Sequence, residues 1–227
     1  MNNLKKVWLS YPINKSVPLY GGRTENFNLY KTSSIKNGNT ANDTRIETTV
    51  HMGTHIDMPY HFHDNGQTIE NFDIDFWFFK KPLFLEFKPE NFIIKDDLIN
   101  LLDDVEDQDY DILIIKTGMC CFRNEEKYWK YNYGFHPDIY TFIKEKYKKI
   151  RVMGFDSISI SSWQDRNLGK ISHQVFLNPS SPLLILEDMD LNYLNNNSEI
   201  KDITVLPLRI ENCDGLPCTI YGTIYEQ

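Results

Sequence analysis

Hydrophobic positions along the chain form short blocks that are separated by polar and turn residues. Blocks rich in valine, isoleucine, leucine, phenylalanine and threonine are typical of β-strands. We expect strands at 7–9, 45–50, 83–87, 111–116, 150–155, 183–186, 203–210 and 219–225.

Two segments instead have a helical pattern. Residues 97–105 form one, and the other begins at Pro137, which is a favourable first helical position. The second helix places one apolar stripe on its surface, made of Ile139, Phe142, Ile143 and Tyr147. Because strands outnumber helices and the two are interspersed, we predict the α/β class with a mixed sheet. No repeat or linker interrupts the pattern, so residues 1–227 are expected to form a single domain.

Composition and charge narrow the function classes. A net charge of -8 argues against nucleic acid or an anionic membrane as the main partner. The first residues, MNNLKKVWLSYPI, lack the apolar core of a signal peptide, and no apolar stretch approaches the ~18 residues of a membrane span. Four cysteines in a chain of this length are expected to be reduced thiols. We therefore expect a cytoplasmic protein.

Four of the six histidines lie within residues 51–63, HMGTHIDMPYHFH. A helix is excluded there because Gly53 and Pro59 are poor interior helix residues. If the segment is a strand, its alternation places His51, His55 and Asp57 on one face, together with Gly53. His61 lies just beyond the proline and can turn back over the same site.

These residue types suit a catalytic metal. Two imidazoles and a carboxylate without a thiolate fit catalytic zinc or manganese better than a structural zinc site. A second ion could be held by His173 and Glu187, with Asp57 as a bridge. The carboxylates of Glu187, Asp188 and Asp190 are also compatible with a solvated turn. A cupin site is not expected, because no glutamate follows His61-Phe62-His63 at the required spacing.

The segment HMGTHIDMPYHF resembles the His-x-Gly-Thr-His-x-Asp-x-Pro-x-His signature of the cyclase family, which includes bacterial kynurenine formamidase and isatin hydrolase. The likeness continues in LSYPINKSVPLYGG, ILIIKTGM, GFDSISI, ISHQVFL with LLILEDMDL, and VLPLRIENCDGLPCTIYG. It implies a mixed, barrel-like β-sheet with peripheral helices and a homodimer. It also implies two divalent metal ions, zinc first and manganese as the alternative.

The resemblance also implies roles for individual residues. His51, His55 and Asp57 would bind the first ion, and His173 and Glu187 would bind the second, with Asp57 bridging. His61 would be the catalytic residue, and Tyr20 would line the substrate pocket. The chain departs from the family near that pocket: NPSSP lengthens the spacing before Glu187, two family prolines are missing from PLYGG and GFDSISIS, and His63 is extra. These departures bear on the substrate more than on the metal.

The leading functional hypothesis is hydrolysis of an aryl formamide such as N-formylkynurenine. A metal-activated hydroxide would attack the carbonyl, and His61 would give a proton to the departing nitrogen. One alternative is the opening of a cyclic amide of the isatin type, and another is a cyclase reaction on a different small carbonyl compound. A metal-binding module without turnover is the alternative outside the enzyme class.

Overall fold

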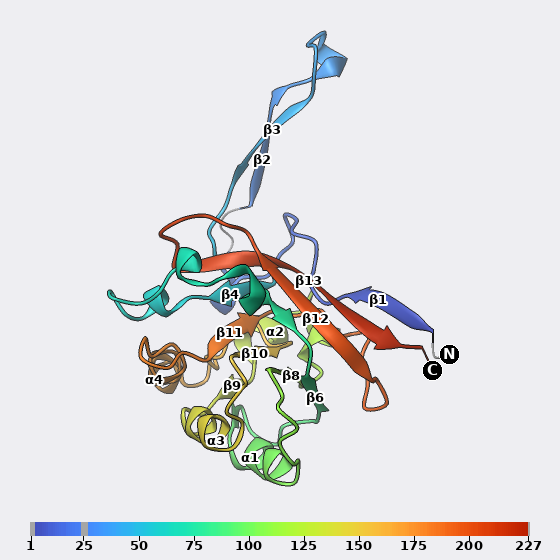
Figure 1. The fold of residues 1–227 in the computed structure, drawn as a ribbon. Coiled ribbons are helices and arrows are strands. Elements are labelled where there is room, and N and C mark those ends of the chain that lie inside the picture. The colour runs from blue at the N-terminus through green and yellow to red at the C-terminus, as the bar shows by residue number, and fades with distance from the viewer. Residues whose placement is uncertain (1–2, 24–26, 227) are drawn as a thin grey trace.

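A curved nine-stranded sheet forms the centre of the protein in its computed structural model, which describes residues 3–23 and 27–226 (Figure 1). Eight of its strands follow the order β5-β12-β13-β4-β11-β10-β8-β6, and β1 pairs with β13. Their bounds are β1 Leu4–Trp8, β4 His55–Asp57, β5 Phe78–Phe79, β6 Pro82–Glu86, β8 Ile112–Lys116, β10 Val152–Phe155, β11 Leu184–Glu187, β12 Ile200–Pro207 and β13 Gly215–Tyr225.

The sheet is mixed, and it curls until its ends nearly meet. Strands β6, β8, β10 and β11 are parallel, whereas β4, β13, β12 and β5 continue the sheet by antiparallel pairing. The end strands β5 and β6 are separated only by Lys80 and Lys81, whose backbone N–H groups donate to the Asp111 carboxylate. The predicted mixed, barrel-like sheet is confirmed.

Continuous apolar runs form the buried centre of this sheet. Each residue from Ile112 to Ile115 in β8 is fully buried, as expected for a parallel strand that is covered on both faces. Four α-helices occur in the described part of the chain: α1 Asp96–Asp103, α2 Lys127–Lys130, α3 Asp138–Lys146 and α4 Arg166–Phe176. Side chains of α1, α3 and α4 join the same core, including Leu98, Ile139 and Phe176. These contacts hold the helices against the sheet.

Shorter elements connect these parts. Strands β7 Ile93–Ile94 and β9 Gly134–Phe135 form a small parallel pair. The described residues also include 3-10 turns at Tyr20–Gly22, Ile35–Asn37, Pro59–His61, Ile69–Asn71, Ile74–Trp77 and Met119–Phe122. Within the described ranges, no helix is both long and apolar enough to cross a membrane.

The helix predictions for 97–105 and for the segment after Pro137 are confirmed by α1 and α3. Helix α4 was not predicted from the sequence. Its buried face consists of Gly169, Ser172, His173 and Phe176, which have helical spacing but supply only one large apolar side chain. A usable signal was Asp165, whose carboxylate caps the helix by accepting from the backbone N–H of Leu168.

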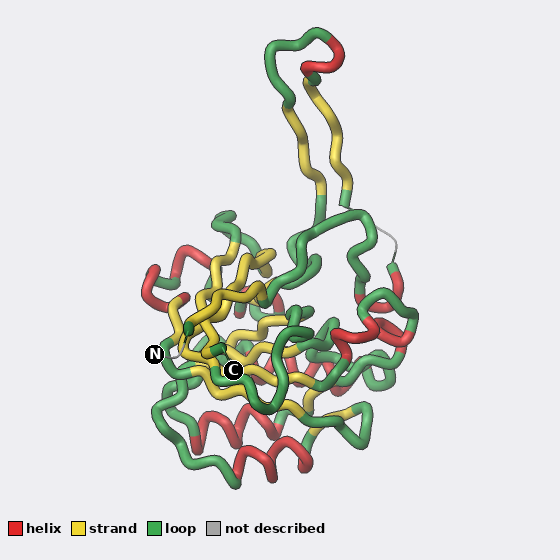
Figure 2. The backbone as a smooth tube through the Cα atoms, turned by 90° about the vertical axis from the view of Figure 1, so that its right-hand side faces the viewer, coloured by secondary structure: helices red, strands yellow, loops and turns green. Residues whose placement is uncertain are grey.

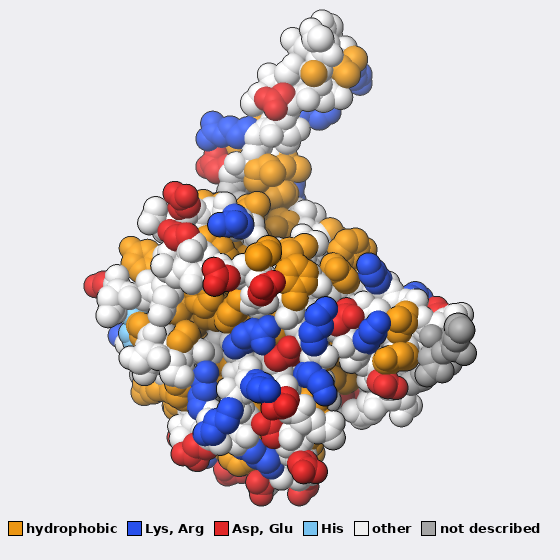
Figure 3. All heavy atoms as spheres, viewed as in Figure 1, with side chains coloured by type: hydrophobic (Ala, Val, Ile, Leu, Met, Phe, Trp, Pro, Cys, Tyr) orange, Lys and Arg blue, Asp and Glu red, His pale blue; other side chains and the backbone are white. Residues whose placement is uncertain are grey.

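The predicted strand at 45–50 is wrong in two respects: it ends earlier, and it does not run on into the histidine segment. Strand β3 Asp43–Glu47 stops before the histidine segment and pairs only with β2 Asn28–Ser33. This β2–β3 hairpin projects from the body of the protein (Figures 1 and 2). Its exposed apolar side chains are Leu29, Tyr30, Ile35 and Ile46. Figure 3 shows hydrophobic side chains on the surface of this projection.

Candidate metal centre

Strand pairing places the first three polar groups of the site. Strand β4 lies between β11 and β13, and its residues His55, Ile56 and Asp57 are all buried. The register sets His55 directly opposite Glu187 of β11. Side chains at opposed positions of an antiparallel pair lie close together on one face. A histidine and a glutamate that are far apart in the sequence therefore meet at the end of β11.

The Asp57 carboxylate lies at the centre of this group. Its Oδ1 is 2.9 Å from Nδ1 of His51 and 3.4 Å from Nε2 of His55, and its Oδ2 is 3.5 Å from Nε2 of His173. The Glu187 carboxylate faces the same two imidazoles, with Oε2 3.5 Å from His55 Nε2 and Oε1 3.9 Å from His173 Nε2. Both carboxylates thus lie between the same pair of imidazoles.

In His55 and His173, the hydrogen bond of one ring nitrogen shows that the other nitrogen faces the carboxylates as an acceptor. Nδ1 of His55 donates to the Gly53 carbonyl, and Nδ1 of His173 donates to the Gly169 carbonyl, both at 2.8 Å. In a neutral imidazole, Nε2 then carries a lone pair. This support of one ring nitrogen by a carbonyl is typical of metal-binding histidines.

Lone pairs that face carboxylate oxygens fit a bound cation. Four of the five nitrogen–oxygen distances, 3.4 to 3.9 Å, exceed the 2.7–3.2 Å usual for N–H···O hydrogen bonds. Ligand atoms at 2.0–2.2 Å from a tetrahedral zinc ion are about 3.3 Å apart. The donor set of nitrogen and oxygen atoms, without sulfur, therefore fits zinc or another divalent ion of similar size.

Electrostatics in the metal-free chain agree with this arrangement. Burial would lower the pKa of His51, but Asp57 and Asp214 outweigh it and raise that pKa to about 10. Burial would raise the pKa of Asp57, but His51 and the other imidazoles hold it well below its ordinary value. Burial and the neighbouring Asp57 charge raise the pKa of Glu187. The centre favours positive charge, which protons supply when no metal is bound.

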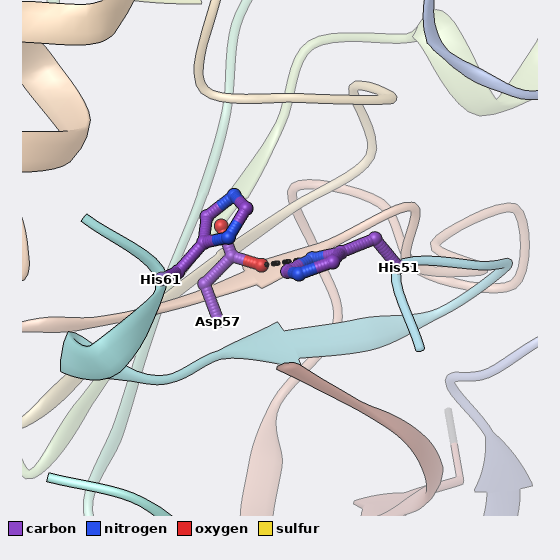
Figure 4. Close-up of side chains that lie close together, drawn as sticks. All are labelled: His51, Asp57 and His61. Atoms are coloured by element: carbon purple, nitrogen blue, oxygen red, sulfur yellow. Dashed lines mark hydrogen bonds and ion pairs between the residues drawn. The ribbon is translucent and has the colours of Figure 1, made fainter. Parts of the chain in front are cut away.

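His61 reaches the site from the 3-10 turn Pro59–His61. Its Nδ1 lies 2.9 Å from Oδ2 of Asp214, and the same oxygen lies 2.8 Å from Nε2 of His51. The His51 and His61 ring centroids are 4.0 Å apart, and both rings lie beside Asp57 (Figure 4). The turn after the proline therefore brings His61 over the site, as the sequence predicted.

Asp214 is a functional candidate that sequence reasoning missed. It lies in the loop before β13, and its bonds to the two histidines hold its pKa far below the ordinary value. The available signal was the Asp-Gly pair within the quoted segment VLPLRIENCDGLPCTIYG. A Cβ atom at Gly215 would lie 2.4 Å from Cε1 of His51, so this histidine needs a glycine beside it.

The predicted strand geometry of the histidine segment is wrong at its start. Strand structure covers only His55–Asp57, and Gly53 has a φ of +62°, which is left-handed and interrupts an extended chain. Alternation therefore accounts for His55 and Asp57, which share a face, but not for His51. A turn at Gly53, not an extended strand, carries His51 to the centre.

The alternative of a solvated turn does not hold for Glu187 and Asp188. Glu187 and Asp188 are 4% and 2% exposed. Asp188 accepts from Nη2 of Arg123 at 2.6 Å and from the Tyr128 hydroxyl at 2.5 Å. A buried polar network thus holds the segment that follows β11, while Glu187 at the end of β11 faces the metal centre.

A cavity of about 800 Å³ opens onto the centre. Phe62 forms part of its wall and stacks on His173, with ring centroids 4.4 Å apart. Tyr20 also lines the cavity, where the resemblance expected it. The extra histidine, His63, lies elsewhere: it is half-buried, and its Nε2 is 2.9 Å from the Gln174 carbonyl.

The structure thus brings together the six residues predicted for the centre, but it offers two groupings. One group is His51, Asp57 and His61, and the other is His55, Asp57 and Glu187. Within each group the possible ligand atoms lie within 4.8 Å of one another. His173 approaches both carboxylates of the second group. The roles assigned to single residues, including the catalytic role of His61, stay predictions.

Comparison with known sequences matches residues 7–162 to the family described as "Putative cyclase". The chain is 27% identical over 210 residues to the kynurenine formamidase of Bacillus mycoides (strain KBAB4), covering 92% of each protein. It is 25% identical over 217 residues to the kynurenine formamidase of Bacillus anthracis, covering 96% of each.

Two solved structures share the fold. One is a potential metal-dependent hydrolase with cyclase activity, with a TM-score of 0.76 and 21% identity over 99% of this chain and 100% of that one. The other is isatin hydrolase A from Labrenzia aggregata bound to benzyl benzoate, with a TM-score of 0.80 and 16% identity over 98% of this chain and 94% of that one. The predicted family and fold are confirmed.

Proposed function

The chain belongs to the cyclase family, and from this premise we propose that it is a metal-dependent hydrolase that cleaves the C–N bond of an amide. The observation that carries the proposal is the Asp57 carboxylate, whose two oxygens face three imidazoles, one from the loop before β4, one from β4 and one from α4. The curated relatives named above are kynurenine formamidases, which supports an aryl formamide such as N-formylkynurenine as the substrate. The reaction would then belong to tryptophan breakdown.

The chain offers ligands for two divalent ions. His51 and His55 would share one ion with Asp57, while His173 and Glu187 would hold the other, with Asp57 as the bridge. Zinc is proposed first because the donors are imidazole and carboxylate at tetrahedral spacing, and manganese is the alternative. Such ions, when bound, lower the pKa of water to about 7 and polarise a carbonyl group.

His61 is the proposed acid. An amine is a poor leaving group until it is protonated, so the departing nitrogen needs a proton donor. Asp214 accepts from Nδ1–H of His61, which leaves Nε2 as the atom that takes up and delivers the proton. The carboxylate thereby fixes the tautomer and orientation of the ring, as in other histidine–carboxylate pairs.

The cavity walls fit an aromatic substrate. Tyr20 and Phe62 place two rings beside the centre, and Leu19 and Ile158 add apolar surface. The similarity to isatin hydrolase A favours a second candidate, the opening of a cyclic amide. Both reactions would use the same centre. Hydrolysis of a formamide releases formate and a separate amine, whereas hydrolysis of a cyclic amide leaves the amine and the new carboxylate in one molecule.

One assay separates these substrates. Protein loaded with zinc or with manganese is incubated with N-formylkynurenine and, separately, with isatin. Formate release supports the formamidase proposal, and ring opening of isatin supports the alternative. Elemental analysis of the same samples gives the identity and number of the ions. A protein that binds metal but acts on neither substrate, nor on a wider amide panel, is a binding module, and the proposal is then wrong.

We also propose that the protein is a cytoplasmic homodimer. The β2–β3 hairpin exposes Leu29 and Ile46, which are 47% and 62% exposed in the single chain. A second copy of the chain would cover these side chains. All four cysteines lie in the described residues and are free, which is consistent with a reducing compartment.

A further inference from the structure

Basic side chains line the outer part of the cavity that holds the metal centre. They are Arg23, from the segment after the Tyr20–Gly22 turn, and Arg166 and Lys170 from α4. Arg166, Lys170 and His173 follow one another at intervals of four and three residues, which places them on one face of the helix. The helix that delivers a candidate metal ligand therefore carries two cations along the same wall.

Among the described residues, no carboxylate of the cavity is left to neutralise these cations. The carboxylates that line it are Asp57 and Glu187 in the centre and Asp188, which is paired with Arg123. Across residues 3–23 and 27–226, neither Arg166 nor Lys170 forms an ion pair. In a chain of net charge -8, a wall of unpaired positive charge is an exception to the overall composition.

Neighbouring groups orient two of the cations without neutralising them. The guanidinium of Arg166 lies over the Trp163 ring, 5.0 Å from its centroid. Nε of Arg23 donates to the Tyr20 carbonyl at 3.4 Å. A ring face and a carbonyl hold a guanidinium in place but leave its charge and further N–H groups available to an anion.

The Tyr20 hydroxyl is a second, independent indication of a ligand. It is buried and has no hydrogen-bond partner among the described residues. Its ring packs edge-on against Trp163, with centroids 5.2 Å apart. Burial raises the pKa of Tyr20 to about 12, and the positive charge of Arg166 acts in the opposite direction. A buried hydroxyl without a partner is costly, and a polar ligand group would satisfy it.

The cavity therefore has two polar ends. Arg166 precedes His173 by seven residues, which corresponds to about 10 Å along the helix axis. The walls between these ends include Leu19, Phe62 and Ile158. A ligand that fits this arrangement has an amide at the inner end, an apolar body and a negative charge at the outer end.

We propose that Arg166 and Lys170 form an anion-binding subsite at the outer end of the cavity, which selects among amide substrates those whose apolar body bears a carboxylate. Arg23 adds positive charge from the facing loop, and the Tyr20 hydroxyl donates to a polar group of the body. The proposal rests on the proposed function, because it assigns residues that recognise the substrate of the same site.

The test compares matched substrates in matched variants. Zinc-loaded wild type, Arg166→Gln, Lys170→Gln and the double variant are assayed with formanilide and with 4-formamidobenzoate, which differ only in the carboxylate. Lys201→Gln is the control, since this exposed lysine of β12 is not among the cavity-lining residues. Zinc content and thermal unfolding are measured for each protein to show that the centre and the fold are intact.

We expect wild type to prefer 4-formamidobenzoate in kcat/KM. Each single replacement should reduce kcat/KM for this substrate about three- to tenfold, mainly through KM, the range for a partly exposed charge-assisted contact. The rate with formanilide should stay within about twofold, and Lys201→Gln should change neither substrate. The preference of wild type should shrink as salt rises from 0.05 to 0.5 M, because salt screens charges near the surface.

Binding of ketones that cannot be hydrolysed keeps this proposal separate from the proposed function. If no amide is turned over, the proposed function fails, but calorimetry with 4-acetylbenzoate and acetophenone still tests the carboxylate site. Tighter binding of 4-acetylbenzoate that disappears in the double variant supports it. Equal losses for charged and neutral ligands would indicate a general structural role, and no loss would place the carboxylate elsewhere, including on the metal; either result overturns the proposal.

Discussion

Two neighbouring segments of the chain, residues 28–47 and 51–63, take opposite roles in the folded protein. The first forms the β2–β3 hairpin, whose apolar side chains are exposed. The second contains β4 and the 3-10 turn with His61, and it buries a carboxylate at its centre. Each segment is extended for part of its length. They differ in what lies beside them.

Strand β4 has a neighbour on each side, whereas β2 and β3 pair only with each other. Pairing on both sides fixes the register of β4, and the register decides which residue faces His55. In the hairpin, the cross-strand pair Leu29 and Ile46 has no covering layer among the residues that the structure describes. Buried polar groups in a fixed register form the candidate site, whereas the exposed apolar groups on the hairpin are the surface that we propose for dimer contact.

Of the changes considered, replacing Asp57 with Asn should have the largest effect, because it removes the carboxylate that the fixed register of β4 buries. The substitution removes the charge that faces three imidazoles, so we expect loss of bound metal. We expect kcat/KM to fall by more than about a hundredfold, the upper range for losing a residue that only supports a ligand. Elemental analysis and the amide assay measure both effects. Asp64→Asn, on an exposed loop nearby, is the control. Full metal content in Asp57→Asn would contradict the assignment.

Replacing His61 with Ala should separate catalysis from metal binding within the same segment. We expect kcat to fall by about a hundredfold or more while the metal content is unchanged, because acid–base groups contribute on this scale. Asp214→Asn should give a smaller decrease, since His61 would remain but lose the carboxylate that orients it. If His61→Ala loses metal instead, His61 is a ligand, consistent with its grouping with His51 and Asp57.

The buried network of Asp188, Arg123 and Tyr128 predicts an effect of pH on stability. Burial and the Asp188 charge raise the pKa of Tyr128 well above 10. Above pH 10 the unfolded chain loses this proton while the folded chain keeps it, so the stability contribution present below pH 10 declines as pH rises. Tyr128→Phe should cost about 1–2 kcal/mol at pH 7, the range for a buried group left without its donor.

Urea unfolding at several pH values provides the measurement. The difference in unfolding free energy between wild type and Tyr128→Phe should shrink between pH 9 and pH 11. Tyr131→Phe, at an exposed tyrosine, should match wild type at neutral pH. A difference that is constant with pH would show that Tyr128 does not resist ionisation in the folded state.

A substitution in the hairpin should have the smallest effect on the stability of a single chain. Ile46→Asp is expected to change the unfolding free energy of a single chain by less than about 0.5 kcal/mol, because the side chain is already exposed. The same variant should weaken the proposed homodimer, which light scattering after gel filtration would detect. Thr44→Asp on the same hairpin is the control for added charge. A wild-type protein that is monomeric at all concentrations would contradict the dimer proposal.

The sequence by itself determined the chemistry and the class of this protein. The dense histidine segment, the Asp57 between its histidines and the apolar blocks were sufficient for the α/β class and a metal centre. They were also sufficient for the family resemblance. Local patterns carry this information because residue type sets ligand chemistry and because continuous apolar runs need a buried sheet.

Tertiary structure alone decided which distant groups complete the centre. The register of β4 with β11 puts Glu187 opposite His55, and a helix with few large apolar residues on its buried face delivers His173. Asp214 reaches His51 and His61 from more than 150 residues away along the chain. Such contacts depend on strand pairing and packing, which no local pattern encodes. The left-handed turn at Gly53 likewise replaced the regular strand that alternation alone had predicted.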